Sequence, residues 1–152
     1  MLIYRLFSNP IKEKIFKSPY FKEIRTYDLN QTITEAQQLS SIGSLVYGSP
    51  HQFICLLQKL ESLNIGDSII LEKYHEALKG DNSSFVMFFV FYIRMTVRMK
   101  GDFEEIRRNL CSDESLINII DENNEHYTIT IKEMLNMLKN DRYVLGIFMK
   151  NV

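Results

Sequence analysis

The sequence predicts a mainly α-helical fold, a single-domain helical bundle with a central apolar helix and a small β-hairpin near residues 116–130. Of the 152 residues, 45% are hydrophobic, which is enough to form one ordinary globular core. Apolar residues recur at helical spacing, and residues that favour helix starts are frequent. No repeat, low-complexity tract or flexible linker divides the chain, so we expect one helical domain over residues 1–152.

Helix starts are indicated by short polar residues that precede a proline or stand three residues before a glutamate. The first arrangement suits proline at the first helical position, and the second is the capping box or its aspartate relative. We expect helices to begin at Asn9-Pro10, Ser18-Pro19, Thr32–Glu35, Ser49-Pro50, Asp102–Glu105 and Thr130–Glu133.

The spacing of apolar residues supports these helices. One apolar face is predicted by Phe53, Leu56, Leu57 and Leu60, and another by Ile131, Met134, Leu135 and Leu138. The pairs Gly66-Asp67 and Gly80-Asp81 each combine a terminating glycine with a new cap, and they bracket a helix of about a dozen residues.

Residues 116–131 differ from the rest of the chain. A β-branched run is followed by a polar turn over 121–125 and then by alternation through Tyr127 and Ile129, which favours a small hairpin.

Residues 85–99 are typical of a central, core-forming helix, because their start is apolar nearly all round. The unbroken apolar run from Phe85 to Ile93 is far below the roughly 18 residues that a bilayer span requires. On a helical wheel Arg94 and Arg98 share one stripe. Where the helix leaves the core, the two charged groups either extend to solvent or pair with carboxylates. The alternative is that they contact a partner protein or an RNA phosphate.

No catalytic, cofactor or metal site is expected. The two cysteines and three histidines lack ligand spacing, and the glycines form no phosphate-binding loop. His51 and Cys55 stand four residues apart, the only hint of a base beside a nucleophile. Because apolar residues surround Cys55, we expect a buried, inert thiol there.

Charge argues against a dedicated nucleic-acid groove, since the net charge is −1 and the isoelectric point is near 6.3. The first 25 residues are locally basic, with six positive and two negative side chains, a surplus of four. This region is interpreted as a solvated helical face, with a direct RNA contact as the alternative.

Five segments resemble, in sequence and in order, the pre-mRNA-splicing factor 38 family: residues 11–23, 32–48, 53–70, 85–97 and 127–149. The resemblance covers nearly the whole chain, in a minimal form without the charged or Arg/Ser-rich tail of longer members. It rests on family motifs at Ser18 to Glu23, at Val46-Tyr47-Gly48, at Tyr92 to Thr96 and at Tyr127 to Leu138 followed by Asp141-Arg142. The motif residues that the resemblance makes candidate partner contacts, with Arg98 beside them, are Tyr20, Phe21, Lys22, Glu23, Tyr47, Gly48, Tyr92, Arg94, Thr96 and Arg98.

The resemblance implies a non-enzymatic scaffold of the nuclear spliceosome, required when the tri-snRNP-containing complex is activated. The implied partners are other splicing proteins, including a zinc-finger factor and a long helical factor. Small nuclear RNA would be met mainly indirectly, with at most a weak direct contact through the basic N-terminal region. We expect no membrane association and a monomer within the larger complex.

One alternative from another class is a helical groove protein of the cell-death-regulator type. It would share the central apolar helix, but it predicts binding of amphipathic death-motif peptides and usually a membrane-directed tail. The sequence ends Phe-Met-Lys-Asn-Val, which is not such a tail.

Overall fold

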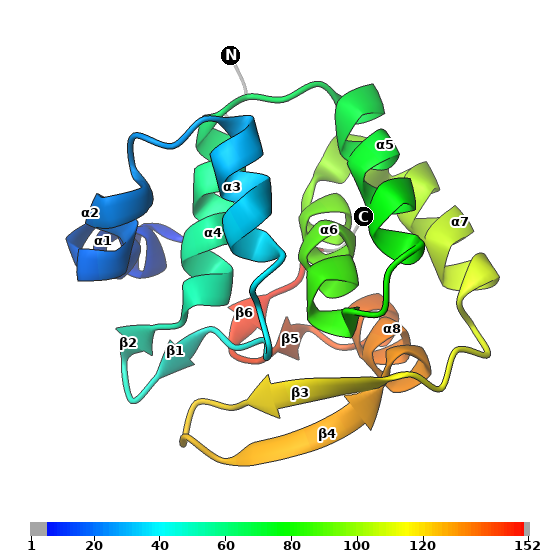
Figure 1. The fold of residues 1–152 in the computed structure, drawn as a ribbon. Coiled ribbons are helices and arrows are strands. Elements are labelled where there is room, and N and C mark those ends of the chain that lie inside the picture. The colour runs from blue at the N-terminus through cyan, green and yellow to red at the C-terminus, as the bar shows by residue number, and fades with distance from the viewer. Residues whose placement is uncertain (1–5, 151–152) are drawn as a thin grey trace.

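A computed structural model describes residues 6–150 and confirms the mainly helical fold (Figure 1). Eight α-helices, one short 3₁₀ segment and three two-stranded antiparallel hairpins make up the described part of the chain. The elements are α1 Asn9–Lys17, α2 Pro19–Ile24, α3 Leu29–Ala36, β1 Leu45–Val46, β2 Ser49–Pro50, α4 Gln52–Ser62, α5 Asp67–Leu78, α6 Ser83–Met95, η1 Val97–Met99, α7 Lys100–Asn109, β3 Leu116–Ile120, β4 His126–Thr130, α8 Ile131–Asn140, β5 Tyr143–Val144 and β6 Ile147–Phe148.

Helix α6 is the centre of the core, as predicted. Twelve of its thirteen residues are buried, and it packs against α4, α5, α7, α8 and β3. Its aromatic residues meet α4 edge to face, with the ring centroids of Phe53 and Phe91 5.1 Å apart. A helix that is apolar on every side must be covered on every side, and the surrounding elements provide that cover.

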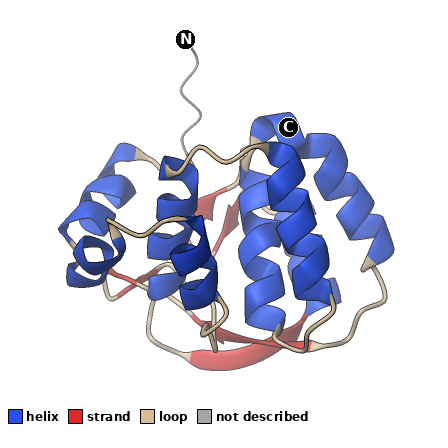
Figure 2. Cartoon of the chain, turned by 45° about the horizontal axis from the view of Figure 1, so that its top comes forward, coloured by secondary structure: helices blue, strands red, loops and turns tan. Residues whose placement is uncertain are grey.

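The predicted hairpin is present and forms β3 and β4, which cross beneath the helices in Figure 2. Asp121 closes its turn, because Asp121 Oδ1 accepts hydrogen bonds from the backbone N–H groups of Asn123 and Glu125, both at 2.9 Å. Ile117 and Ile119 of β3 are buried beneath the helices. The β-branched run therefore supplies one apolar face of the sheet to the core.

Several predicted helix boundaries are confirmed. Helix α2 starts at Pro19 after Ser18, and α5 fills the interval between Gly66 and Gly80. Its predicted cap was wrong, because Gly66 is the N-cap and Asp67 is already helical. Thr130 and Glu133 form a reciprocal capping box at the start of α8. Helix α1 also begins as predicted, but Ser8 is its N-cap and Asn9 is already helical.

Other predicted caps were wrong because neighbouring residues take the role. Ser49-Pro50 forms strand β2, and His51 caps α4 instead. Helix α3 is capped by Asp28 and Gln31, which places Thr32 inside the helix, where its hydroxyl donates to the Asp28 carbonyl at 2.8 Å.

Two aspartates that were predicted to cap helices do not do so. Helix α7 begins at Lys100 directly after η1, so Asp102 lies in its first turn and makes no cap. Asn82, not Asp81, caps α6, and its Oδ1 accepts from the Phe85 N–H at 3.2 Å.

The predicted continuation of the central helix to Met99 was also wrong. Helix α6 stops at Met95 because Thr96 adopts extended backbone angles, and the Thr96 hydroxyl donates to the Tyr92 carbonyl at 2.7 Å. This break turns Arg98 away from the stripe that carries Arg94. The two arginines therefore have different surroundings.

No helix within residues 6–150 is long and apolar enough to cross a membrane.

Candidate docking surface

The buried motif residues hold the fold together. Phe21, Tyr92, Arg94 and Thr96 are buried, and Tyr20 is half-buried. The remaining motif residues, Lys22, Glu23, Tyr47, Gly48 and Arg98, are exposed. The exposed set and the half-buried Tyr20 can meet a partner without a rearrangement of the core.

Arg94 has an internal partner. The side chain is 6% exposed, and its Nε donates to the Leu138 carbonyl in the last turn of α8 at 2.6 Å. The guanidinium also lies 5.7 Å from the centroid of the Phe103 ring on α7. Burial lowers the pKa of Arg94, and the nearby Glu104 carboxylate acts in the opposite direction. The guanidinium donates to a backbone carbonyl that has no partner within the last turn of α8. Arg94 therefore connects α6 to both α7 and α8.

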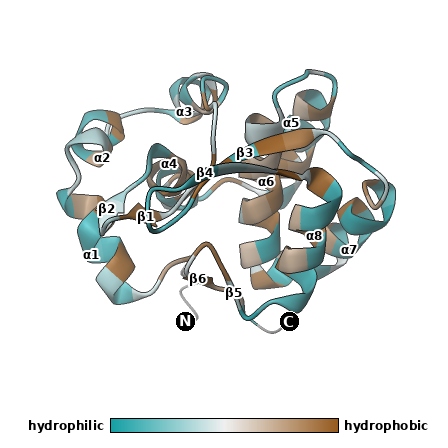
Figure 3. Ribbon diagram, turned by 90° about the horizontal axis from the view of Figure 1, so that it is seen from below, coloured by the Kyte–Doolittle hydropathy of each residue, from teal (hydrophilic) through white to brown (hydrophobic). Residues whose placement is uncertain are grey.

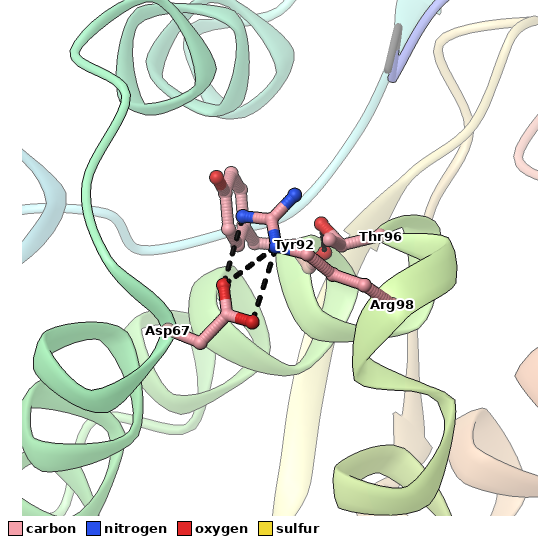
Figure 4. Close-up of polar contacts among 4 residues, drawn as sticks. All are labelled: Asp67, Tyr92, Thr96 and Arg98. Atoms are coloured by element: carbon pink, nitrogen blue, oxygen red, sulfur yellow. Dashed lines mark hydrogen bonds and ion pairs between the residues drawn. The ribbon is translucent and has the colours of Figure 1, made fainter. Parts of the chain in front are cut away.

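Arg98 pairs with Asp67 at the start of α5 (Figure 4). Arg98 Nε lies 2.8 and 3.1 Å from the two carboxylate oxygens, and Arg98 Nη2 lies 2.8 Å from Asp67 Oδ1. Hydrogen bonding to Asp67 raises the pKa of Arg98, and a hydrogen bond to Tyr92 contributes as well. Burial raises the pKa of the Tyr92 hydroxyl. The motif from Tyr92 to Thr96, together with Arg98, therefore fixes the end of α6.

His51 and Cys55 are not brought together. Both nitrogens of the His51 ring are in use, because Nδ1 accepts from the Phe53 N–H at 2.9 Å and Nε2 lies 3.1 Å from the Ser41 hydroxyl. Cys55 Sγ instead faces Ser18 Oγ at 3.9 Å, and burial raises the pKa of the thiol to about 11. A buried, protonated thiol without a base is unsuited to nucleophilic catalysis. Within residues 6–150, no three His, Cys, Asp or Glu side chains are grouped to hold a metal ion.

Two hairpin turns place bulky residues in the left-handed region of backbone space. Tyr47 and Leu145 have φ values of 51° and 52°, and each is followed by a glycine, Gly48 or Gly146, at φ 77°. These are the positive angles of a two-residue hairpin turn, for which Asn-Gly or Asp-Gly is the usual choice. A bulky residue there carries backbone strain of order 1–3 kcal/mol.

The two strained residues differ in what surrounds them. Leu145 is 8% exposed, and its carbonyl accepts a hydrogen bond from the buried Ser44 hydroxyl. Burial therefore compensates its strain. Tyr47 is 76% exposed, so the core gains nothing from its side chain. Side-chain burial therefore does not compensate the strain at Tyr47, and strained backbone of this kind clusters at functional sites.

The turns meet at one end of the molecule. Tyr47 N–H donates to the Glu122 carbonyl in the β3–β4 turn at 3.0 Å. Gly146 has a φ of 77°, which favours glycine, and the position that a Cβ would take there lies 2.9 Å from Glu122 Oε1. Next to Gly48, Lys14 of α1 comes within 3.7 Å of the position that a Cβ would take. The β1–β2 turn therefore lies beside α1, and Glu122 stands between it and the β5–β6 turn.

A groove of about 520 Å³ lies between the start of α1 and the β5–β6 hairpin. Its two exposed aromatic side chains, Tyr143 and Phe148, are 58% and 50% exposed, with ring centroids 5.6 Å apart. Figure 3 shows this hairpin between α1 and α8. The groove is lined by Leu6, Phe7, Ser8, Asn9, Ile11, Tyr143, Gly146, Ile147, Phe148 and Lys150.

Sequence reasoning did not find Tyr143 and Phe148. The signal was present, because Val144-Leu145-Gly146 repeats the pattern of Val46-Tyr47-Gly48 and predicts a second tight turn between aromatic strand residues.

The basic side chains of α1 and α2 are mostly solvated. Lys14, Lys17, Lys22 and Arg25 are exposed, and Lys12 lies 5.8 Å from the centroid of the Phe16 ring. Arg5 lies outside the described residues.

The sequence model of the PRP38 family matches residues 4–152. The chain belongs to the PRP38 family. This confirms the resemblance to the pre-mRNA-splicing factor 38 family and excludes the cell-death-regulator alternative. Among curated proteins no significant match is found. In the solved Snu23–Prp38–MFAP1(217–258) complex of Chaetomium thermophilum, one chain has the same fold, with a TM-score of 0.84 and 20% identity. The alignment covers 96% of this chain and 76% of that chain.

Proposed function

We propose that this PRP38-family protein is a non-catalytic scaffold of the spliceosome, which docks other splicing factors when the tri-snRNP-containing complex is activated. The observation that carries the proposal is the aromatic groove between α1 and the β5–β6 hairpin, beside the strained and exposed Tyr47. Exposed aromatic residues around a concave apolar surface are typical of the central contacts of protein interfaces.

A helical partner suits this groove. An amphipathic helix presents apolar side chains at i, i+3, i+4 and i+7, and such a row can pack against Tyr143 and Phe148. In the similar complex, Prp38 is present with Snu23 and with residues 217–258 of MFAP1. By analogy, the partners of this chain include a long helical factor and a zinc-finger factor.

The proposal places the protein in the nucleus, as a monomer within the larger complex. Contact with small nuclear RNA is mainly indirect, because the basic side chains of α1 and α2 are spread over a solvated surface that also carries Glu13 and Glu23. The purified chain should therefore bind a small nuclear RNA only weakly at physiological salt.

Affinity purification from cells of the source organism tests the scaffold role. The tagged wild-type chain should recover splicing proteins together with small nuclear RNAs. The double variant Tyr143→Ser/Phe148→Ser should lose the helical factor, because both side chains are exposed and their removal takes apolar area only from the groove.

Matched controls separate docking from folding. The variant Phe16→Ser removes an aromatic residue of similar exposure outside the groove lining and should keep every partner. Circular dichroism must show that all variants fold. Recovery of no splicing factor by the wild type, under conditions that recover a known spliceosomal protein, would refute the scaffold role.

A further inference from the structure

Among the described residues, 6–150, nothing pairs with the outer edge of strand β4. Its neighbour β3 is bonded on both sides, to β4 along the hairpin and to Ile42, whose N–H donates to the Asn118 carbonyl and whose carbonyl accepts from the Ile120 N–H. Within residues 6–150, β4 pairs with β3 alone. In Figure 1 the strand lies at the bottom of the molecule, with no element drawn beyond it.

Two hydrogen bonds fix which backbone groups of β4 face outward. At the turn, the Asp121 N–H donates to the Glu125 carbonyl at 3.0 Å, and at the open end the Ile131 N–H donates to the Ser115 carbonyl at 2.9 Å. Hydrogen-bonded pairs alternate along an antiparallel ladder, so every second residue of β4 pairs with β3.

Counting every second residue from these two bonds, Tyr127 and Ile129 are the residues of β4 that form hydrogen-bonded pairs with β3. The N–H and carbonyl groups of His126 and Thr128 therefore point away from β3, and both residues are exposed. At the end of the strand, the Thr130 N–H is already used by the capping box of α8. The free edge thus offers two donors and two acceptors at the spacing of an extended chain.

Nothing in the sequence of β4 blocks this edge. Edge strands are usually protected by lysine, proline or a bulge, whereas His-Tyr-Thr-Ile-Thr contains neither residue and pairs in regular register.

The acidic side chains of the hairpin favour a basic strand as the added one. The hairpin, residues 116–130, contains Asp121, Glu122 and Glu125 and no lysine or arginine. Glu125 is exposed directly before β4, whereas the Glu122 carboxylate lies against Gly146 of the β5–β6 turn. Pairing with a second copy would bring two acidic hairpins together, whereas a basic strand meets complementary charge.

We propose that the outer edge of β4 binds an extended, lysine- or arginine-containing segment of a partner protein, which adds to the hairpin as a third strand. Backbone hydrogen bonds to His126 and Thr128 provide the affinity, and the acidic residues of the hairpin select for basic sequences. This surface is separate from the aromatic groove and does not depend on its function.

The test uses Thr128→Pro, which removes one outward N–H and leaves the ladder bonds to β3 intact. Its matched control is Thr128→Val, which keeps the N–H and the β-branched shape. A displayed library of random peptides about ten residues long, enough to span the strand, is selected on the full wild-type chain. Affinities of the selected peptides for all three chains are then measured by fluorescence anisotropy, after ¹⁵N spectra establish that each variant is folded.

Basic peptides with alternating β-branched residues should be enriched. They should bind Thr128→Val as tightly as wild type and Thr128→Pro about tenfold more weakly, since one lost hydrogen bond is worth about that factor. N-methylation of alternate peptide residues should abolish binding, and added salt should weaken it.

Three results would overturn the proposal. The first is that no selected peptide binds Thr128→Pro more weakly than wild type. The second is that the peptides that do bind Thr128→Pro more weakly are acidic or uncharged. The third is sedimentation of the wild type as a dimer that Thr128→Pro dissociates, because the edge would then be occupied by a second copy of the chain.

Discussion

Tyr47 and Leu145 occupy equivalent positions in two similar turns, and their surroundings assign them different roles. Both adopt a backbone conformation that costs a bulky side chain energy, but only Leu145 is buried. A strained residue that the core does not need can be replaced with a gain in stability. The same replacement then reveals whether a partner needs it.

Replacement of Tyr47 by asparagine should stabilise the protein by about 1 kcal/mol, because asparagine tolerates a positive φ and completes an Asn-Gly turn. Binding of the helical factor should weaken at the same time. Urea unfolding and a binding titration measure the two effects. The equivalent change Leu145→Asn should instead destabilise by about 2–3 kcal/mol, since it places an amide in the core. Unchanged binding by Tyr47→Asn would remove Tyr47 from the docking surface.

Replacement of Arg94 by methionine should lower the free energy of unfolding by about 1–3 kcal/mol, because the Leu138 carbonyl loses its donor and Phe103 loses its cation. Arg98→Met breaks a partly exposed pair with Asp67 and the contact with Tyr92, and it should cost about 0–1 kcal/mol. Urea unfolding of both variants compares them directly. Equal losses would mean that Arg94 does not hold α6 against α7 and α8.

Cys55 and Cys111 should differ strongly in reactivity toward an alkylating reagent at neutral pH. Cys111 is exposed, whereas Cys55 is buried with its thiol pKa raised to about 11. Mass spectrometry should find Cys111 modified quickly and Cys55 modified only as fast as the protein unfolds. Rapid labelling of Cys55 would reopen the question of a nucleophile there.

At the scale of single elements, local signals identified most of the structure. The all-round apolar run identified α6, the pair of glycines identified α5, and the β-branched alternation identified the hairpin of β3 and β4. These signals depend on residues close in sequence. The failures depended on contacts between distant ones. Pro50 lies in a strand because its hairpin packs beside α1, and the Arg94 partner Leu138 is 44 residues away.

The cap of α4 should make stability depend on pH. Burial lowers the pKa of His51, and the cap requires a neutral ring, because Nδ1 must accept the Phe53 N–H. The folded state thus binds this proton less readily than the unfolded state. The stability it contributes is present above the unfolded pKa of about 6.5 and is lost as the pH falls through the lower folded pKa.

Urea unfolding at about pH 7 and pH 5 measures this loss. In His51→Asn, which keeps a capping acceptor without a titrating ring, the loss between the two pH values should be smaller than in wild type. An equal loss in both proteins would assign the pH dependence to other groups.

At the scale of the whole molecule, the exposed features gather on two surfaces. One is the aromatic groove of α1 and the β5–β6 hairpin with Tyr47 beside it, and the other is the outer edge of β4. The family motifs located Tyr47, but the second aromatic hairpin and the free strand edge became visible only when the chain was folded. Partner recognition depends on such surfaces, which no short segment contains by itself.

The two surfaces should bind independently. Tyr143→Ser/Phe148→Ser should leave the affinity for a basic β-strand peptide unchanged, and Thr128→Pro should leave recovery of the helical factor unchanged. Anisotropy titrations and affinity purification of each variant check this pair of expectations. A loss of both activities in either variant would mean that the surfaces form one continuous interface.

Thr130 is both the last residue of β4 and the N-cap of α8, so no loop separates the hairpin from the helix. Because no flexible residue separates them, β4 and α8 should move as one rigid unit. The free strand edge is at one end of this unit, and the Arg94 contact with Leu138 is at the other. The backbone amides of β4 and of the first turn of α8 should therefore open together in hydrogen exchange, as a single cooperative step.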